Sequence, residues 1–98
     1  MERSEYAGVW LAEGVRLEID PGGAVRYKRE EGSHKVEINA PIIEFEGDDF
    51  AVGIWLARTT FVVSEAPRWD GENWTMVVDG RRLTRVADPP DPSDSIRI

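Results

Sequence analysis

The chain has 98 residues, enough for one domain with a single modest core. It carries 19 acidic and 12 basic residues and a formal net charge of -7, so a general affinity for nucleic acid, which needs clustered Lys and Arg, is not expected. It has no cysteine, which excludes disulfides and thiolate zinc sites.

The first ten residues, MERSEYAGVW, are charged and contain no apolar signal segment. Nowhere does the sequence approach the roughly 18 apolar residues that a membrane span requires. We therefore expect no membrane association and a cytoplasmic location, unless an export signal was removed from the sequence.

Val and Ile far outnumber Leu, and nine Gly and six Pro interrupt the chain. This composition predicts an all-β fold rather than helices. We expect a small antiparallel meander of about eight or nine short strands, either a closed barrel or a strongly twisted sheet, in a single domain over residues 1–86. Residues 87–98, ADPPDPSDSIRI, are predicted to form an extended tail rich in Pro and Asp.

Residues 6–11 are predicted to form the first strand, and residues 15–29 the first hairpin. A three-residue loop at 21–23, Pro-Gly-Gly, pairs Ile19 with Val25 and keeps the apolar side chains on one face. The outer face of this hairpin then carries four charged side chains: Arg16, Glu18, Arg26 and Lys28. In this register Arg16 lies opposite Lys28, a like-charge pair that the sequence does not explain.

Residues 35–39 form a further strand, and residues 42–54 form the second hairpin. A four-residue loop, 46–49, gives two core pairs, Phe45 with Phe50 and Ile43 with Val52.

The stretch FAVGIWLARTTFVV, residues 50–63, is nearly all apolar. A turn at Arg58-Thr59 would extend the core face with two pairs, Leu56 with Phe61 and Ile54 with Val63. The opposite face would then present an apolar platform made of Ile42, Ala51, Gly53, Trp55, Ala57 and Val62.

Residues 73–86 form the last hairpin, because Asp79-Gly80 is a strong signal for a type I′ turn. This turn pairs Met76 with Leu83 and places Arg85 opposite Trp74, where a cation–π contact is expected.

The segment Tyr6-Ala7-Gly8-Val9-Trp10 resembles the G-x-W opening of lipocalins and related calycin barrels. The likeness covers Gly8 and Trp10 and the general order of antiparallel strands. It implies a barrel closed at one end by the Trp, with an apolar ligand inside. The ending NWTMVVDGRRLTRV is similar to small uncharacterised bacterial β domains, and this second likeness implies no function.

Catalytic motifs are not found. His34 is the only histidine, and no G-x-S-x-G or S-x-x-K pattern places a hydroxyl beside a base. Two carboxylate clusters, Glu46 with Asp48 and Asp49, and Asp70 with Glu72, fall in predicted turns, where acidic residues are common in any case. We expect no catalytic residue, no metal and no cofactor.

Trp69 lies in a predicted loop beside Arg68 and has two interpretations: an anchor for a partner protein, or a lid folded back over one end of the core. The apolar platform leaves three possible covers: a protein partner or second copy of the chain, the chain's own tail through Ile96 and Ile98, or a small apolar ligand. We therefore expect a non-catalytic protein-interaction or homo-oligomerising domain that uses the Trp55 platform and Trp69. The alternatives are lipocalin-like binding of a small apolar molecule and, third, an enzyme.

Overall fold

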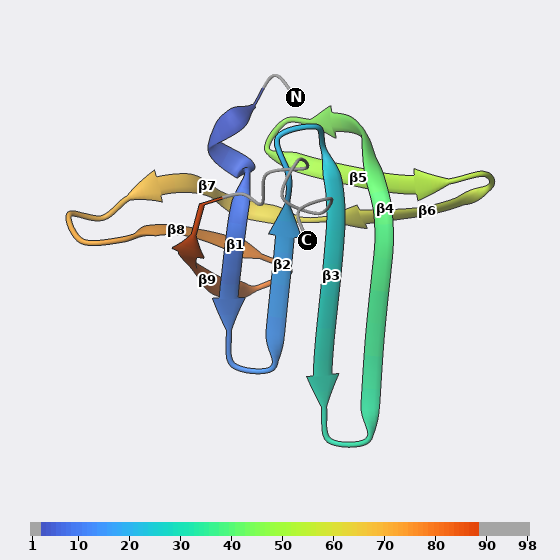
Figure 1. The fold of residues 1–98 in the computed structure, drawn as a ribbon, viewed down its shortest axis with the longest axis horizontal. Helices are drawn as coiled ribbons and strands as arrows, with labels where there is room; N and C mark the ends of the chain where they lie inside the picture. Colours follow the sequence, from blue (N-terminus) through green and yellow to red (C-terminus); the bar gives the residue numbers. More distant parts are fainter. Residues whose placement is uncertain (1–2, 89–98) are drawn as a thin grey trace, which may run out of the picture.

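The computed structural model describes residues 3–88, and these form one antiparallel sheet curled into a half-barrel (Figure 1). A short 3-10 turn, η1 (Ser4–Tyr6), precedes nine strands. The strands are β1 (Gly8–Ala12), β2 (Val15–Ile19), β3 (Ala24–Glu31), β4 (His34–Glu46), β5 (Asp49–Ile54), β6 (Ala57–Phe61), β7 (Val63–Trp69), β8 (Trp74–Val78) and β9 (Arg81–Ala87). The expected all-β antiparallel fold is confirmed.

The spatial order of the strands is β6-β5-β4-β3-β2-β1-β9-β8-β7. Consecutive strands are therefore neighbours with one exception: β6 and β7 lie at the two opposite edges. The first and last strands, β1 and β9, pair with each other. Within the described residues the sheet is thus open rather than a fully hydrogen-bonded barrel. In Figure 1 the upright strands β1 to β4 cross strands β5 to β8, which run roughly horizontally.

The core lies between these two sets of strands, and alternate apolar residues of β2, β3, β5 and β8 are buried in it. Trp10 is completely buried and its indole N–H donates to the Tyr6 carbonyl at 2.9 Å. The Tyr6 hydroxyl donates to the Asp48 carbonyl at 2.8 Å, and burial raises the pKa of this phenol. The largest fully buried side chains are Trp10, Tyr6, Phe50, Phe61, Leu17, Ile19, Met76 and Leu83.

Strand β4 is a single 13-residue strand where two separate strands were expected. Its first part, up to Pro41, pairs with β3, and its second part, from Ile42, pairs with β5. A bulge between Ile42 and Glu44 sets Ile42 opposite Val52, so the expected pair of Ile43 with Val52 is wrong. The strand therefore forms the corner at which the sheet changes direction.

Other registers agree with the turn chemistry. Ile19 lies opposite Val25, Phe45 opposite Phe50 and Met76 opposite Leu83, as expected. The turn between β8 and β9 has positive φ at both central residues, Asp79 (48°) and Gly80 (80°), as a type I′ turn requires. The Arg85 guanidinium lies 5.4 Å from the centre of the Trp74 ring.

The like-charge pair of Arg16 and Lys28 is also present, and the structure explains how it is tolerated. Arg16 forms an ion pair with Glu18 at 3.2 Å, and Lys28 forms one with Glu30 at 3.4 Å. Each cation is therefore neutralised along its own strand.

Strand β1 begins at Gly8 rather than at residue 6, because η1 occupies the preceding residues. At the other end β9 continues to Ala87 and pairs there with Val9, one residue past the expected domain limit. Residues 89–98, which include Ile96 and Ile98, lie outside the described residues, so the expected tail is not placed.

A candidate interaction surface at the β5–β6 hairpin

The turn that joins β5 to β6 consists of Trp55 and Leu56, not of Arg58 and Thr59. The pairing is regular over five residues, from Ile54 opposite Ala57 to Phe50 opposite Phe61. The expected pairs of Leu56 with Phe61 and Ile54 with Val63 are therefore wrong. The observed register fills the core with the Phe50 and Phe61 rings, which stack at 5.0 Å.

This register also divides the expected apolar platform between two faces of the sheet. Ala51 and Gly53 lie opposite Thr60 and Arg58, whereas Ala57 lies on the other face, across from Ile54. The remaining members do not join Ala51 and Gly53 on one continuous surface. Ile42 packs against the core, and Val62 follows the end of β6. The platform as expected does not form.

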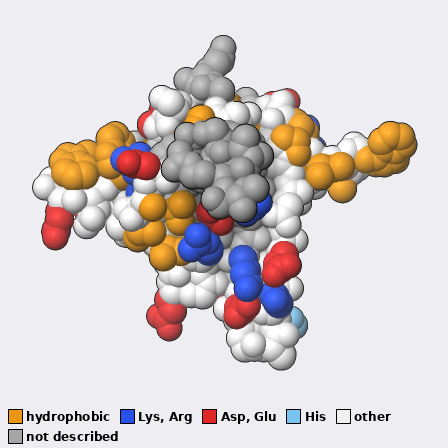
Figure 2. Space-filling view, in the orientation of Figure 1, with side chains coloured by type: hydrophobic (Ala, Val, Ile, Leu, Met, Phe, Trp, Pro, Cys, Tyr) orange, Lys and Arg blue, Asp and Glu red, His pale blue; other side chains and the backbone are white. Residues whose placement is uncertain are grey.

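The apolar surface lies instead at the tip of the hairpin. Trp55 is 94% exposed and Leu56 is 91% exposed, and the preceding Ile54 is 57% exposed. Figure 2 shows hydrophobic side chains at the right-hand extremity of the molecule, where the β5–β6 hairpin projects in Figure 1. We call these three residues, Ile54, Trp55 and Leu56, the apolar tip.

The backbone at the apolar tip is unfavourable for the residue that occupies it. Trp55 has a φ of 61°, a conformation that two-residue hairpin turns normally give to Gly, Asn or Asp. For a bulky side chain a positive φ is a real outlier and costs on the order of 1 kcal/mol or more. Neither turn preference nor core packing explains a tryptophan at this position.

The base of the hairpin is held firmly to β4. A Cβ on Gly53 would lie 2.8 Å from the Ala57 carbonyl oxygen and 3.1 Å from Ile43 Cδ1, so this close approach requires glycine. Across the same face Arg58 forms an ion pair with Glu44. A hollow of about 260 Å³ lies between β4 and the hairpin, lined among others by Ile38, Ala40, Val52, Ile54, Ala57 and Thr59.

Sequence reasoning missed Ile54 and Leu56, which it placed in the core. The pairing of Phe50 with Phe61 contained the correct signal, because two aromatic side chains opposite each other stabilise a strand pair. That register leaves Trp55 and Leu56 as the turn.

Trp69 does not join the apolar tip. It lies at the end of the β7–β8 hairpin, which projects on the left in Figure 1, whereas the β5–β6 hairpin projects on the right. It is 55% exposed and its ring lies 6.2 Å from that of Trp74, directly across the strand pair. It is therefore a half-exposed member of a tryptophan pair and not a lid over the core.

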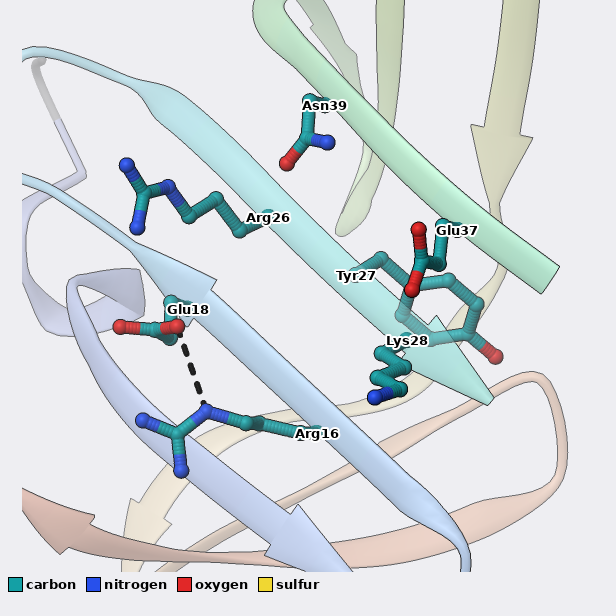
Figure 3. A pocket seen from close by; sticks show the side chains of 7 residues that line it. All are labelled: Arg16, Glu18, Arg26, Tyr27, Lys28, Glu37 and Asn39. Carbon is teal, nitrogen blue, oxygen red and sulfur yellow. Dashed lines mark hydrogen bonds and ion pairs between the residues drawn. The ribbon is translucent and has the colours of Figure 1, made fainter. Parts of the chain in front are cut away.

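A second hollow, of about 340 Å³, lies on the outer face of β2, β3 and β4 (Figure 3). Its lining is mostly charged: Arg16, Glu18, Arg26, Tyr27, Lys28, Glu37 and Asn39. The charged outer face expected for the first hairpin is thus confirmed. Its mixed charges do not suit an apolar ligand.

The acidic residues of the turns have structural roles. The Asp49 carboxylate accepts the Val63 N–H at 2.7 Å, and the Asp70 carboxylate accepts the N–H groups of Glu72 and Asn73 at 2.9 and 2.7 Å. These backbone hydrogen bonds, that of Asn73 first, hold the pKa of Asp70 below its ordinary value. Over residues 3–88, no three His, Asp or Glu side chains are grouped so that they could hold a metal ion.

No helix in the described part of the chain is long and apolar enough to cross a membrane. Comparison with known proteins found no matching family model, no similar curated protein and no similar solved structure.

Proposed function

We propose that this protein is a non-catalytic interaction domain that binds a protein surface through the apolar tip of its β5–β6 hairpin. The observation that carries the proposal is the near-complete exposure of Trp55 and Leu56, together with the positive φ of Trp55. Backbone outliers of this kind cluster at functional sites, and tryptophan is enriched among the residues that dominate binding energy at interfaces.

The projecting geometry supports a protein partner with a concave apolar site. A two-residue turn presents both side chains at the extremity of a strand pair, so they can enter a concave site ahead of the rest of the sheet. The hairpin is anchored at its base by Gly53 and by the ion pair of Arg58 with Glu44. The tip is therefore suited to insertion rather than to flat contact.

The lipocalin-like alternative requires an internal apolar cavity, typically about 300 Å³ or more. The space between the two sets of strands is occupied by Trp10, Tyr6, Phe50 and Phe61, all fully buried. This filled interior is why we favour the interaction domain.

The test is site-specific photo-crosslinking in the cells that produce the protein. A benzoylphenylalanine probe at Leu56 should give a discrete adduct, with a second protein or with another copy of the chain. A matched probe at Ser33, which is exposed in the β3–β4 turn, should not. Excess unlabelled wild-type protein should suppress the adduct, and excess Trp55→Ser protein should not.

Equal adducts from the two probes, or no adduct from Leu56, would contradict the proposed function. The Trp55→Ser protein must keep the thermal stability of the wild type, since a side chain that is 94% exposed contributes little to the core.

A further inference from the structure

The outer face of the first hairpin carries a cation that has no ionic partner within residues 3–88. Arg16 is paired with Glu18 at 3.2 Å and Lys28 with Glu30 at 3.4 Å, but Arg26, on the same face, forms no ion pair with any described residue. Arg26 lies directly opposite Glu18 in the strand register. Figure 3 shows its guanidinium apart from that carboxylate, which is bonded to Arg16 instead.

The register places Arg26 in a line of residues that crosses the sheet. Ala87 lies opposite Val9, Val9 opposite Glu18, and Glu18 opposite Arg26. Residues directly opposite each other on antiparallel strands share a face. Trp10, the neighbour of Val9 in β1, is fully buried in the core, so these four residues lie on the outer face. We call them the cross-strand row.

Strand β9 ends on this outer face because of a bulge. Arg85 lies opposite Trp10, whereas Ala87 lies opposite Val9. The register shift between these two pairs makes Val86 an extra residue of β9. Strict alternation would have put Ala87 on the core side together with Arg85, and the bulge puts it on the other side. The chain therefore leaves the sheet from one end of the cross-strand row.

The sequence that follows β9 has the length and the stiffness to cross this row. Pro89 and Pro90 have no backbone N–H to continue the strand ladder, and two prolines favour an extended polyproline II segment. At about 3.1 Å per residue, Asp91 then lies about 12 Å from Ala87. Arg26 lies three strand spacings from Ala87, about 14 Å. The side chains of Asp91 and Arg26 are long enough to close the remaining gap of about 2 Å.

We propose that residues 89–91, which lie outside the described residues, cross β1 and β2 on the outer face and that the Asp91 carboxylate pairs with the Arg26 guanidinium. A carboxylate and a guanidinium can form two parallel charge-assisted hydrogen bonds, which makes Arg26 a specific partner. The occupant of this sheet face is thus a segment of the same chain. The inference goes beyond the proposed function, because this surface is separate from the apolar tip.

The charges of the hollow in Figure 3 favour an acidic segment. Both carboxylates that line it already have cationic partners: Glu18 is paired with Arg16, and Glu37 with Lys35 at 3.4 Å. An incoming anion therefore meets the free guanidinium of Arg26. A single exposed ion pair is weak, but the covalent connection raises the local concentration of the segment to about the millimolar range. We expect docked and undocked states in exchange, with the docked state weakened by salt.

The test is paramagnetic relaxation enhancement measured by NMR on the full chain. Because the chain has no cysteine, Ser93→Cys carries a single spin label two residues beyond Asp91. In the docked state the label should broaden the backbone amide signal of Asn39, which lies directly opposite Arg26 on β4. The amide of Ser33, roughly 20 Å further along the same strand pair, serves as the internal reference.

Arg26→Gln and Asp91→Asn should each lower the ratio of docked to undocked chains by about two- to fivefold, and the broadening at Asn39 should fall with it. The matched control is Lys35→Gln, which removes the same charge from the same strand pair outside the cross-strand row and should leave the broadening unchanged. Exchanging the charges, with Arg26→Asp and Asp91→Arg in one chain, should restore it. A purely structural role of Arg26 would not produce that recovery.

Broadening at Asn39 that is absent in the wild type, or that Arg26→Gln leaves unchanged, would overturn the inference. So would broadening in a mixture of spin-labelled chains with isotope-enriched unlabelled ones, because that signal would come from a neighbouring molecule. Neither result would affect the proposed function, whose readout is the adduct formed by the Leu56 probe.

Discussion

The two edges of the sheet differ in how they are protected. Strand β7 contains Pro67, has two register shifts within seven residues, and carries Glu65 in ion pairs with Arg68 and Arg82. Strand β6 pairs without a shift over its full length and contains no proline, and its one charged residue is Arg58, paired with Glu44. Prolines, bulges and charges are the devices by which natural sheets prevent edge-to-edge association.

The difference between the two edges supports the proposal that a partner binds on the β6 side of the sheet. A strand edge with a single charge, no proline and no bulge, beside an exposed Trp and Leu, is an aggregation hazard unless a specific partner covers it. The β7 edge has a proline and two register shifts, whereas the β6 edge has neither. The β6 edge is the one next to the apolar tip.

The largest effect is expected from Phe61→Ala. Phe61 is fully buried, and the centre of its ring lies 5.0 Å from that of Phe50 and 4.9 Å from that of Tyr27. It therefore anchors the end of β6 in the core. Its truncation should lower the free energy of unfolding by about 3 to 5 kcal/mol in urea titrations. The matched control is Thr60→Ala, one residue earlier and exposed, which should change it by about 0.5 kcal/mol or less. Similar losses for both variants would mean that β6 is not anchored as described.

A smaller loss of stability is expected when the contact between Val62 and Asp79, at the end of β6, is removed. Asp79→Ala removes the acceptor for the Val62 N–H and a residue suited to positive φ. The free energy of unfolding should fall by about 1 to 2 kcal/mol. Asp79→Asn keeps an oxygen acceptor and tolerates this φ, so it should restore most of the loss. Equal losses for Ala and Asn would show that the contact with Val62 does not stabilise the fold.

Replacing the two turn residues of the apolar tip should raise the free energy of unfolding. Replacing Trp55-Leu56 by Gly-Asn places glycine at the first central residue, the one with positive φ, as a type II′ turn favours, and relieves the positive φ of Trp55. Chemical denaturation should show an increase of about 1 kcal/mol in stability. Trp55→Ala, which removes the ring but keeps a side chain at this φ, should give no comparable gain. A loss of stability with Gly-Asn would mean that the tip is part of the folded core after all.

The smallest change in stability is expected at the turn that follows β7. Backbone hydrogen bonds from Asn73 and Glu72 hold the pKa of Asp70 below its ordinary value of 3.8. The ionised carboxylate therefore stabilises the folded state above that pH, and this stabilisation is lost as the pH falls through the lowered pKa. Asp70→Asn should melt slightly below the wild type at neutral pH, and the difference should shrink in strong acid. A difference that stays constant with pH would assign the effect to something other than this charge.

How far the sequence predicts the structure depends on the turns. At Pro21 to Gly23 and at Asp79-Gly80 the residue types match the backbone, so the register of both hairpins follows directly. At Trp55 the backbone takes a positive φ that no turn rule assigns to tryptophan. Burying Ile54 and Leu56 in the core was the more natural expectation, and it moved the turn by three residues.

The candidate site was predicted only in part for the same reason. That Trp55 is a surface residue follows from its failure to fit the core, but its neighbours depend on the register. The bulge near Ile42 and the bend of β4 arise from packing between distant strands, and local sequence patterns do not carry that information. The protected and unprotected edges became visible only once the strand order was known.

The pairing of β1 with β9 has a consequence for the order in which the molecule assembles. All the other strand pairs of the described sheet join neighbours in the chain, so they can form early with little loss of loop entropy. The contact of Val9 with Ala87 must wait until both ends of the polypeptide meet. A circular permutant that joins residues 1 and 98 and opens the chain at Ser33 would make the longer pairing of β3 with β4 the non-local one instead, so its refolding should be slower in stopped-flow measurements.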